Sequence, residues 1–250
     1  MRGIKAPLTE LGWPLISLAL LLAVWEATAR LFRFSAVVLP TPLLVLESIQ
    51  HNFGRLVQET GITMLESVLG FVIGAGGAFI LGILFVHSQP VKRSIYPYAI
   101  ALKSTPLIAI APLLTLWFGN GIFSKVVMSA IVAFFPVLVN AAAGLSSGDP
   151  LQLDLMATLS ARWWQILTKV RIPNSLPYVF ASLKVASSMA VVGAVIGEFT
   201  GSASGIGHLL TTSSYYLDTS LVFAGVLFIT AAGLAFFGII AYLEKHVVFW

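Results

Sequence analysis

Six long apolar segments determine what this chain can fold into. Each is mostly apolar over roughly 20 residues or more, the length that an α-helix needs to cross a membrane. The chain is 58% hydrophobic and 10% charged, whereas a soluble domain carries about 25% charged residues. The sequence therefore predicts an all-α integral membrane protein with six transmembrane helices, at about residues 12–31, 61–86, 95–118, 122–145, 176–199 and 219–243.

The segment 33–60 connects the first two predicted spans. After Leu39-Pro-Thr-Pro42, the stretch Leu43–Leu56 has apolar residues at helical spacing, which indicates a short helix at the membrane interface or on a neighbouring span. The first apolar run is too long for a signal peptide and no small-x-small cleavage site follows it, so we expect a retained span. We divide the chain into a first span plus connector, 1–60, and a core of spans two to six, 61–245.

Lysine and arginine residues in the loops indicate the orientation of the chain. If the N-terminus is inside, eight of them fall on the inner side and four on the outer side, and cytoplasmic loops carry the excess of positive charge. Both termini and the loop 146–175 are therefore expected in the cytoplasm. The eight are Arg2, Lys5, Lys92, Arg93, Arg162, Lys169, Arg171 and Lys245, and the four are Arg30, Arg33, Arg55 and Lys125.

Two predicted spans carry small residues at every fourth position, which places them on one helix face where another helix can approach closely. Ordinary packing within the subunit and a special interface both explain these stripes. Pro106 and Pro112 interrupt the third span, which is tolerated only against protein or a water-filled cavity. The stripes are Gly70, Gly74, Ala78 and Gly82 in span two, and Gly193, Gly197 and Gly201 at span five.

Three charged residues are placed within or near membrane depth, where charge is costly and faces the bundle interior. Glu198 either lines a translocation path or makes a hydrogen bond between helices. Lys103 either lines a path together with Thr105 or extends its side chain towards the membrane surface, and Glu66 is expected to have a structural role.

Several classes of chemistry are excluded by composition and motifs. The chain has no cysteine, and its four histidines share no metal-ligand spacing, so we expect no metal site. No catalytic motif and no P-loop occurs, so we expect no catalytic residue and no cofactor bound by this chain, and any ATP must be bound by another chain. The net charge of +4 is explained by residues that flank the spans, without nucleic acid.

The loop 146–175 is a polar, basic island between apolar segments. Asp149 is a good N-cap and Pro150 a good first helical residue, and no Pro or Gly interrupts Leu151–Val170, so a continuous helix is expected there. Pro173 and Pro177 are expected to break the chain before span five. The island is then a helical hairpin parallel to the membrane, which either binds anionic lipid or docks a cytoplasmic partner.

The spacing in this island resembles the EAA loop of binding-protein-dependent ABC importer permeases. An acidic residue, Asp154, is followed six positions later by a small one, Ser160, and the loop ends in Val170-Arg-Ile-Pro173. The family's Glu-Ala-Ala is Asp154-Leu-Met156 here, and its glycine is Ser160. Further segments are similar to the nitrate, sulfonate and taurine branch, over about residues 35–245. They include Leu39–Pro42, Thr63–Gly70, Pro106–Pro112, Leu116–Gly119, Phe134–Asn140, Gly197–Phe199 and Gly205–Gly207.

The resemblance implies the type I ABC importer permease fold, with a cytoplasmic coupling helix between spans four and five. It implies a pair of permease copies in a bacterial inner membrane, two cytoplasmic ATPase subunits that carry ATP and magnesium, and an extracytoplasmic substrate-binding protein. The residues expected to dock the ATPase are Asp154, Ala157, Ser160, Ala161, Arg162, Trp164 and Lys169. Those expected to line the translocation path are Lys103, Thr105, Ser187, Ser188 and Glu198.

The alternative function is a stand-alone channel or secondary carrier, with the island as a lipid-binding helix. Carriers pair repeated halves, and these six spans contain no internal repeat, which favours the importer. The branch transports small organic anions such as nitrate, sulfonates and taurine, and heterocycles such as riboflavin and thiamine precursors. The forms Thr63-Met-Leu-Glu66 and Lys103-Ser-Thr-Pro106 are slightly more similar to the heterocycle transporters.

Overall fold

The computed structural model describes residues 8–248 and is helical throughout, with no strand in that range. Within these residues five helical stretches are long and apolar enough to cross a membrane, and there are six if the bent pair α3 and α4 is counted as one broken span. The all-α membrane architecture is thereby confirmed. The helices are α1 (Leu8–Leu31), α2 (Pro42–His87), α3 (Gln89–Ser104), α4 (Leu107–Phe118), α5 (Ile122–Ser146), α6 (Pro150–Thr158), α7 (Trp163–Ile166), η1 (Leu167–Arg171), α8 (Ile172–Phe199), α9 (Ile206–Tyr215) and α10 (Thr219–Val247).

Helix α2 is longer than the predicted second span. The prediction of a separate short helix over Leu43–Leu56 is wrong, because that segment and the span form one helix of 46 residues. Thr41 caps its start by accepting a hydrogen bond from the Leu44 amide, and Pro42 occupies the first turn, where no amide donor is needed. A helix of this length is about 70 Å long. It therefore reaches from one end of the bundle to the other.

The third predicted span is broken in the middle. Helices α3 and α4 meet at an angle of 100° at the break that contains Thr105 and Pro106. Pro106 causes this break, because it has no amide donor and its ring disfavours a helical conformation at Thr105. Pro112, which we expected to interrupt the same span, lies inside α4 without ending it.

The core lies where α2, α5, α8 and α10 pack together. Its buried side chains include Phe71 and Phe85 from α2, Leu138 from α5 and Phe236 from α10. The glycine stripe of α2 faces α5: a methyl group on Gly74 would lie 2.3 Å from the Ala130 carbonyl oxygen. Gly193 and Gly197 of α8 likewise approach backbone atoms of α5, whereas Gly201, which was predicted on the same helix face, lies beyond the end of α8. The predicted stripes within α2 and α8 are therefore places where helices of this subunit approach closely.

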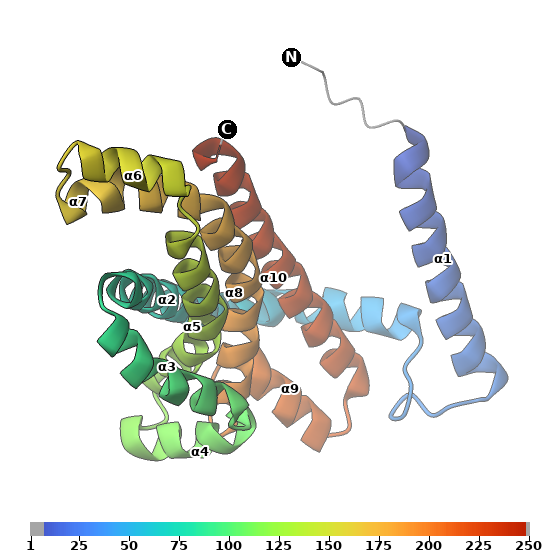
Figure 1. Ribbon diagram of the computed structural model, residues 1–250. Coiled ribbons are helices and arrows are strands. Elements are labelled where there is room, and N and C mark those ends of the chain that lie inside the picture. The colour runs from blue at the N-terminus through green and yellow to red at the C-terminus, as the bar shows by residue number, and fades with distance from the viewer. Residues whose placement is uncertain (1–7, 249–250) are drawn as a thin grey trace.

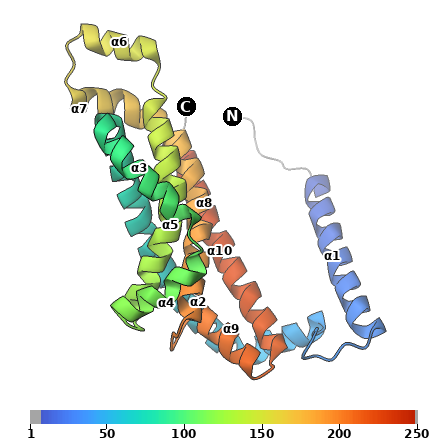
Figure 2. The same ribbon diagram turned by 60° about the horizontal axis from the view of Figure 1, so that its bottom comes forward.

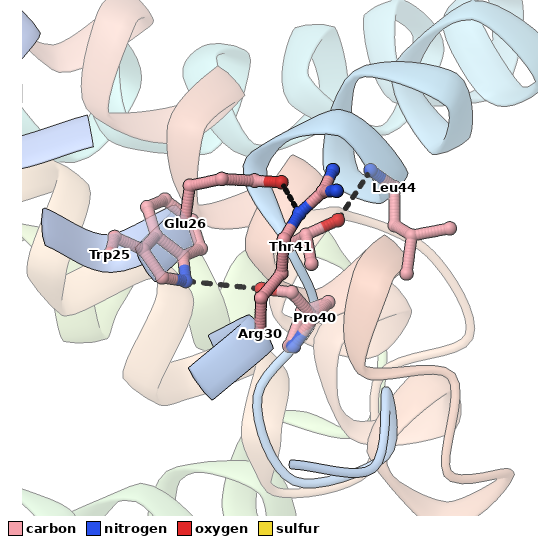
Figure 3. Close-up of polar contacts among 6 residues, drawn as sticks. All are labelled: Trp25, Glu26, Arg30, Pro40, Thr41 and Leu44. Carbon is pink, nitrogen blue, oxygen red and sulfur yellow. Dashed lines mark hydrogen bonds and ion pairs between the residues drawn. The ribbon is translucent and has the colours of Figure 1, made fainter. Parts of the chain in front are cut away.

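Helix α1 stands apart from the other helices in both views (Figures 1 and 2). It is attached at its C-terminal end, where the Trp25 indole N–H donates to the Pro40 carbonyl at 3.0 Å (Figure 3). The Trp25 ring also packs on Phe223 of α10, with 5.3 Å between ring centroids. One turn further on, Arg30 pairs with Glu26. An apolar helix with internal backbone hydrogen bonds is stable when lipid surrounds it.

Helices α6 and α7 form a hairpin across one end of the bundle (Figure 1). The same end holds the start of α1 and the end of α10, whereas α4 and α9 lie at the opposite end in both views. Because the first and last described helices begin and end at the same end of the bundle, the chain crosses the bundle an even number of times, as predicted from sequence. Arg2 and Lys5, which were counted on the inner side, lie outside the described residues.

Candidate functional site: an exposed hairpin and a buried polar cluster

The helix α6 projects from the bundle, and none of its residues is buried. Asp149 caps it as predicted, because its carboxylate accepts a hydrogen bond from the Leu151 amide at 3.0 Å, and Pro150 is the first helical residue. Two large apolar side chains are exposed on it, Leu151 at 77% and Leu155 at 60%. Exposed apolar groups at the end of a membrane bundle mark a contact surface.

The prediction of a continuous helix from Leu151 to Val170 is wrong. Helix α6 ends at Thr158, and Ser160 adopts a left-handed conformation with φ of 52°. The Ser160 amide then donates to the Ala157 carbonyl and the Ala161 amide to the Met156 carbonyl, the two bonds of a Schellman motif. Glycine is the usual residue at this left-handed position, and the EAA loop has glycine there. With serine in its place, no local signal revealed the end of the helix.

The chain after the turn is helical from Trp163 to Phe199 without a break. The prediction that Pro173 and Pro177 separate the island from span five is therefore wrong. A proline ring inside a helix clashes with the carbonyl four residues earlier. The widened π-turn Leu167–Arg171, in which the Ile172 amide bonds to the Leu167 carbonyl, precedes Pro173 and relieves that clash. The second half of the hairpin, from Trp163, and span five are consequently one continuous helix.

The residues predicted to dock a partner lie together on this hairpin. All are exposed except Ala161, which is half-buried, and Trp164 is 68% exposed. Its neighbour Trp163 turns inward and packs edge-on against His87 at the end of α2, with 4.3 Å between ring centroids. The Arg171 guanidinium donates to the Leu145 carbonyl of α5 at 2.8 Å. The hairpin is thus tied to α2, α5 and α8. The predicted docking residues are Asp154, Ala157, Ser160, Ala161, Arg162, Trp164 and Lys169.

The residues predicted to line a path do not share one location. Thr105 is exposed at the break between α3 and α4, and Ser188 is exposed on α8, in a groove of about 450 Å³ against α9 and α10. Ser187 is fully buried and donates to the Lys184 carbonyl of its own helix, and Glu198 is 1% exposed. The side chain of Lys103 lies outside the described residues. The assignment of these residues to a path stays a prediction.

A buried polar cluster lies at the end of the bundle opposite the hairpin. Glu198 of α8 accepts hydrogen bonds from the Thr63 hydroxyl of α2, at 2.6 Å, and from the Gly207 amide, at 2.5 Å. Glu66 lies beside Glu198, and one of its carboxylate oxygens is buried without a partner. Lys125 of α5 is 1% exposed and donates to the Asn120 carbonyl at 2.5 Å.

Sequence reasoning missed three members of this region. Lys125 was counted as an outer loop residue, although it is buried in α5. Thr63 was noted only as part of a family segment, and Glu59, which accepts a hydrogen bond from the Gly205 amide at 2.6 Å, was not noted. The available signal was the spacing of Glu59, Thr63 and Glu66, which places all three on one face of α2. Among residues 8–248, no group of three or more acidic or histidine side chains is arranged to hold a metal ion.

Comparison with known proteins identifies the family to which this bundle and hairpin belong. Residues 66–249 match the model of the binding-protein-dependent transport system inner membrane component, which covers most of the chain and all of the hairpin. The chain belongs to this family. The permease is 34% identical to the riboflavin transport system permease of Chloroflexus aurantiacus, over 96% of this chain and 90% of that one. It is 30% identical to a putative aliphatic sulfonates transport permease of Bacillus subtilis, over 96% and 88% of the two chains.

Solved structures agree with this fold. The permease superposes on a chain of the inward-facing methionine ABC transporter with a TM-score of 0.69, over 78% of this chain and 97% of that one. It superposes on an amino acid ABC transporter with a TM-score of 0.65. At 15% and 17% identity these matches show the type I importer fold alone. The family predicted from the island is confirmed.

Proposed function

We propose that this permease is the non-catalytic membrane subunit of an ATP-driven importer and works as a pair of copies. Two cytoplasmic ATPase subunits, which carry ATP and magnesium, dock on the hairpin α6–α7, and an extracytoplasmic binding protein delivers the solute. The chain itself binds no cofactor. The N- and C-terminal ends and the hairpin lie in the cytoplasm of a bacterial cell, and the other end faces outward.

The observation that carries this proposal is the exposed hairpin at the end shared by the start of α1 and the end of α10. Its surface has the composition of a protein interface, with Leu155 and Trp164 exposed at 60% and 68% beside the rim charges Arg162 and Lys169. Because α7, η1 and α8 form one continuous helix, movement of a docked partner is passed to span five through helical backbone.

We propose that Lys103, Thr105 and Ser188 line the translocation path. Thr105 and Ser188 present hydroxyl groups at exposed positions, and Lys103 belongs to the same segment as Thr105. The solute is a small organic anion or a heterocycle, since relatives are named for aliphatic sulfonates, taurine, riboflavin and formylaminopyrimidine transport. Solute choice rests largely with the binding protein. A thermal-shift screen of that protein with these four solute types tests the class.

Docking is tested by replacing Trp164 with alanine and isolating the membrane complex through a tag on the permease. We expect recovery of the ATPase subunits to fall about tenfold or more, because an exposed tryptophan at an interface centre contributes about 2 kcal/mol or more. Tyr216→Ala is the matched control: this aromatic residue is 74% exposed at the opposite end of the bundle. It should leave ATPase recovery unchanged.

Two results would contradict the proposal. Unchanged recovery of ATPase subunits with Trp164→Ala and with a second variant, Leu155→Asp, would remove the hairpin as the docking surface. Loss of binding to anionic lipid vesicles in the same variants, with ATPase recovery intact, would favour the alternative of a lipid-binding helix in a stand-alone carrier.

A further inference from the structure

The first three amides at the start of α9 are held by side chains from two other helices. The Gly205 amide donates to the Glu59 carboxylate at 2.6 Å, the Ile206 amide to the Thr63 hydroxyl at 2.8 Å, and the Gly207 amide to the Glu198 carboxylate at 2.5 Å. The amides at a helix start have no partners within the helix. Here each finds one on α2 or α8. We call Glu59, Thr63 and Glu198 the α9 latch.

The latch is closed against the backbone of α9. A methyl group on Gly205 would lie 2.0 Å from a Glu198 carboxylate oxygen, and one on Gly207 would lie 2.8 Å from the Glu198 Cβ. Thr63 and Glu198 are at most 1% exposed. No other residue type fits at these two glycines while Glu198 keeps its place. Opening the latch would leave a buried carboxylate and buried amides without partners, which is strongly unfavourable.

A second set of contacts joins α9 to α2 independently of the latch. Ile206 and Leu209 of α9 are fully buried against Val45 and Leu56 of α2, in a cluster that Leu221 of α10 completes. Polar and apolar contacts therefore hold the first half of α9 to α2. While the latch is intact, we expect no state of the protein in which α9 moves away from α2.

The other ends of α2 and α8 lie at the hairpin. His87 near the end of α2 packs on Trp163, and α8 continues from Trp163 without a break. A displacement of the hairpin is therefore applied to α2 and α8 together. At the far end of the bundle, α2 and α8 contact each other again in the latch. There the Thr63 hydroxyl donates to the Glu198 carboxylate, 135 residues away in the chain.

We propose that α2, α8 and α9 move as one rigid unit during transport, and that Thr63 and Glu198 are positioning residues which keep α9 in that unit. This inference rests on the proposed function, since the motion originates in the docked ATPase. With the latch intact, closure of the ATPase subunits displaces α9 at the opposite face of the membrane. With the latch broken, ATP is hydrolysed but α9 no longer follows.

The discriminating variants are Thr63→Val and Thr63→Ser. Valine has the shape of threonine without the hydroxyl, so it leaves the Ile206 amide and one lone pair of Glu198 without a partner, whereas serine keeps the hydroxyl. In liposomes with the ATPase and binding protein, we expect Thr63→Val to lower riboflavin or taurine uptake per ATP hydrolysed about tenfold, the equivalent of one lost buried hydrogen bond. Thr63→Ser should restore it. A merely structural role would lower uptake and hydrolysis together.

A distance measurement tests the rigid unit directly. The chain has no cysteine, so the pair Val57→Cys on α2 and Tyr215→Cys on α9, at positions 49% and 82% exposed, carries two spin labels without background. The labelled copy is mixed with excess unlabelled copies in the whole complex. We expect one narrow distance distribution, the same without nucleotide and with a non-hydrolysable ATP analogue. Thr63→Val should broaden it and Thr63→Ser should not.

The outcomes separate this inference from the proposed function. A distance that changes between the two nucleotide states, or a Thr63→Val variant with normal uptake per ATP, overturns the rigid unit. A broadened distribution only in Thr63→Val supports it. If the spin-labelled complex with Thr63 intact has a narrow, constant distance and the complex without labels takes up neither solute, the rigid unit stands and the proposed solute class fails.

Discussion

Replacing Gly74 with alanine should destabilise the permease more than any other single methyl group added to α2. The new Cβ would lie 2.3 Å from the Ala130 carbonyl oxygen and 3.0 Å from two further backbone atoms of the same residue. Backbone atoms cannot rotate away as a side chain does, so α2 and α5 must separate. Overpacking costs about 1–3 kcal/mol, and we expect the upper end or more. In detergent the midpoint of thermal unfolding should fall by roughly 5–10 °C.

Gly77→Ala is the matched control for this prediction. It is the same change one turn further along the same helix, but a Cβ there meets nothing within 4 Å. Alanine is favoured over glycine inside a helix by about 0.5–1 kcal/mol, so this variant should unfold at the same temperature or slightly higher. Equal midpoints for the two variants would mean that α2 and α5 do not pack at Gly74 as described.

Replacing Ser160 with valine should weaken docking of the ATPase about tenfold, through its effect on the backbone alone. Ser160 has a φ of 52° and its side chain is exposed, so the substitution removes no packing. A left-handed conformation costs about 1–2 kcal/mol for an ordinary residue and is least accessible to a β-branched one. The Schellman turn should open, and the position of Trp164 relative to α6 should change. We expect recovery of ATPase subunits with the tagged permease to fall about tenfold.

A glycine substitution at the same position is the matched control, because it should relieve backbone strain rather than add it. Glycine adopts the left-handed conformation without strain, so Ser160→Gly should keep full docking and ATP hydrolysis. Both substitutions are uncharged, and they differ in the conformations that the backbone allows. If valine and glycine dock equally well, the turn does not determine the docking surface, and the side chains of α6 act without it.

Most of the transmembrane architecture was accessible from the sequence because it depends on local chemistry. Runs of apolar residues require helices in lipid, and five of the six predicted spans each lie within one long helix. The cap at Asp149 and the break at Pro106 were also readable, since each depends on one residue and its immediate neighbours. The predictions were wrong where the preferences of neighbouring residues do not determine the local structure. Helix α2 continues through a stretch that polarity suggested was separate, and the π-turn accommodates Pro173.

The candidate docking surface was predicted more completely than the buried cluster. Its residues are adjacent in the chain and polar in an apolar context, so the sequence displays them. The turn at Ser160 was hidden, because a non-glycine residue in a left-handed conformation has no sequence signature, and so was the continuity of the helix through Pro173. The two serines predicted for the path differ because exposure on a helix depends on what packs against it. Ser187 is buried and Ser188 is exposed.

The sequence by itself therefore determined that this chain lies in a membrane as an α-helical bundle, and that the loop 146–175 contains a polar helical hairpin. Periodicity, capping and charge decide these features within a few residues of chain. Only the tertiary structure decided that Glu59 and Thr63 hold the amides of α9. The atoms that meet there come from positions up to 146 residues apart. Their partnership depends on how α2 and α8 pack, which no local preference encodes.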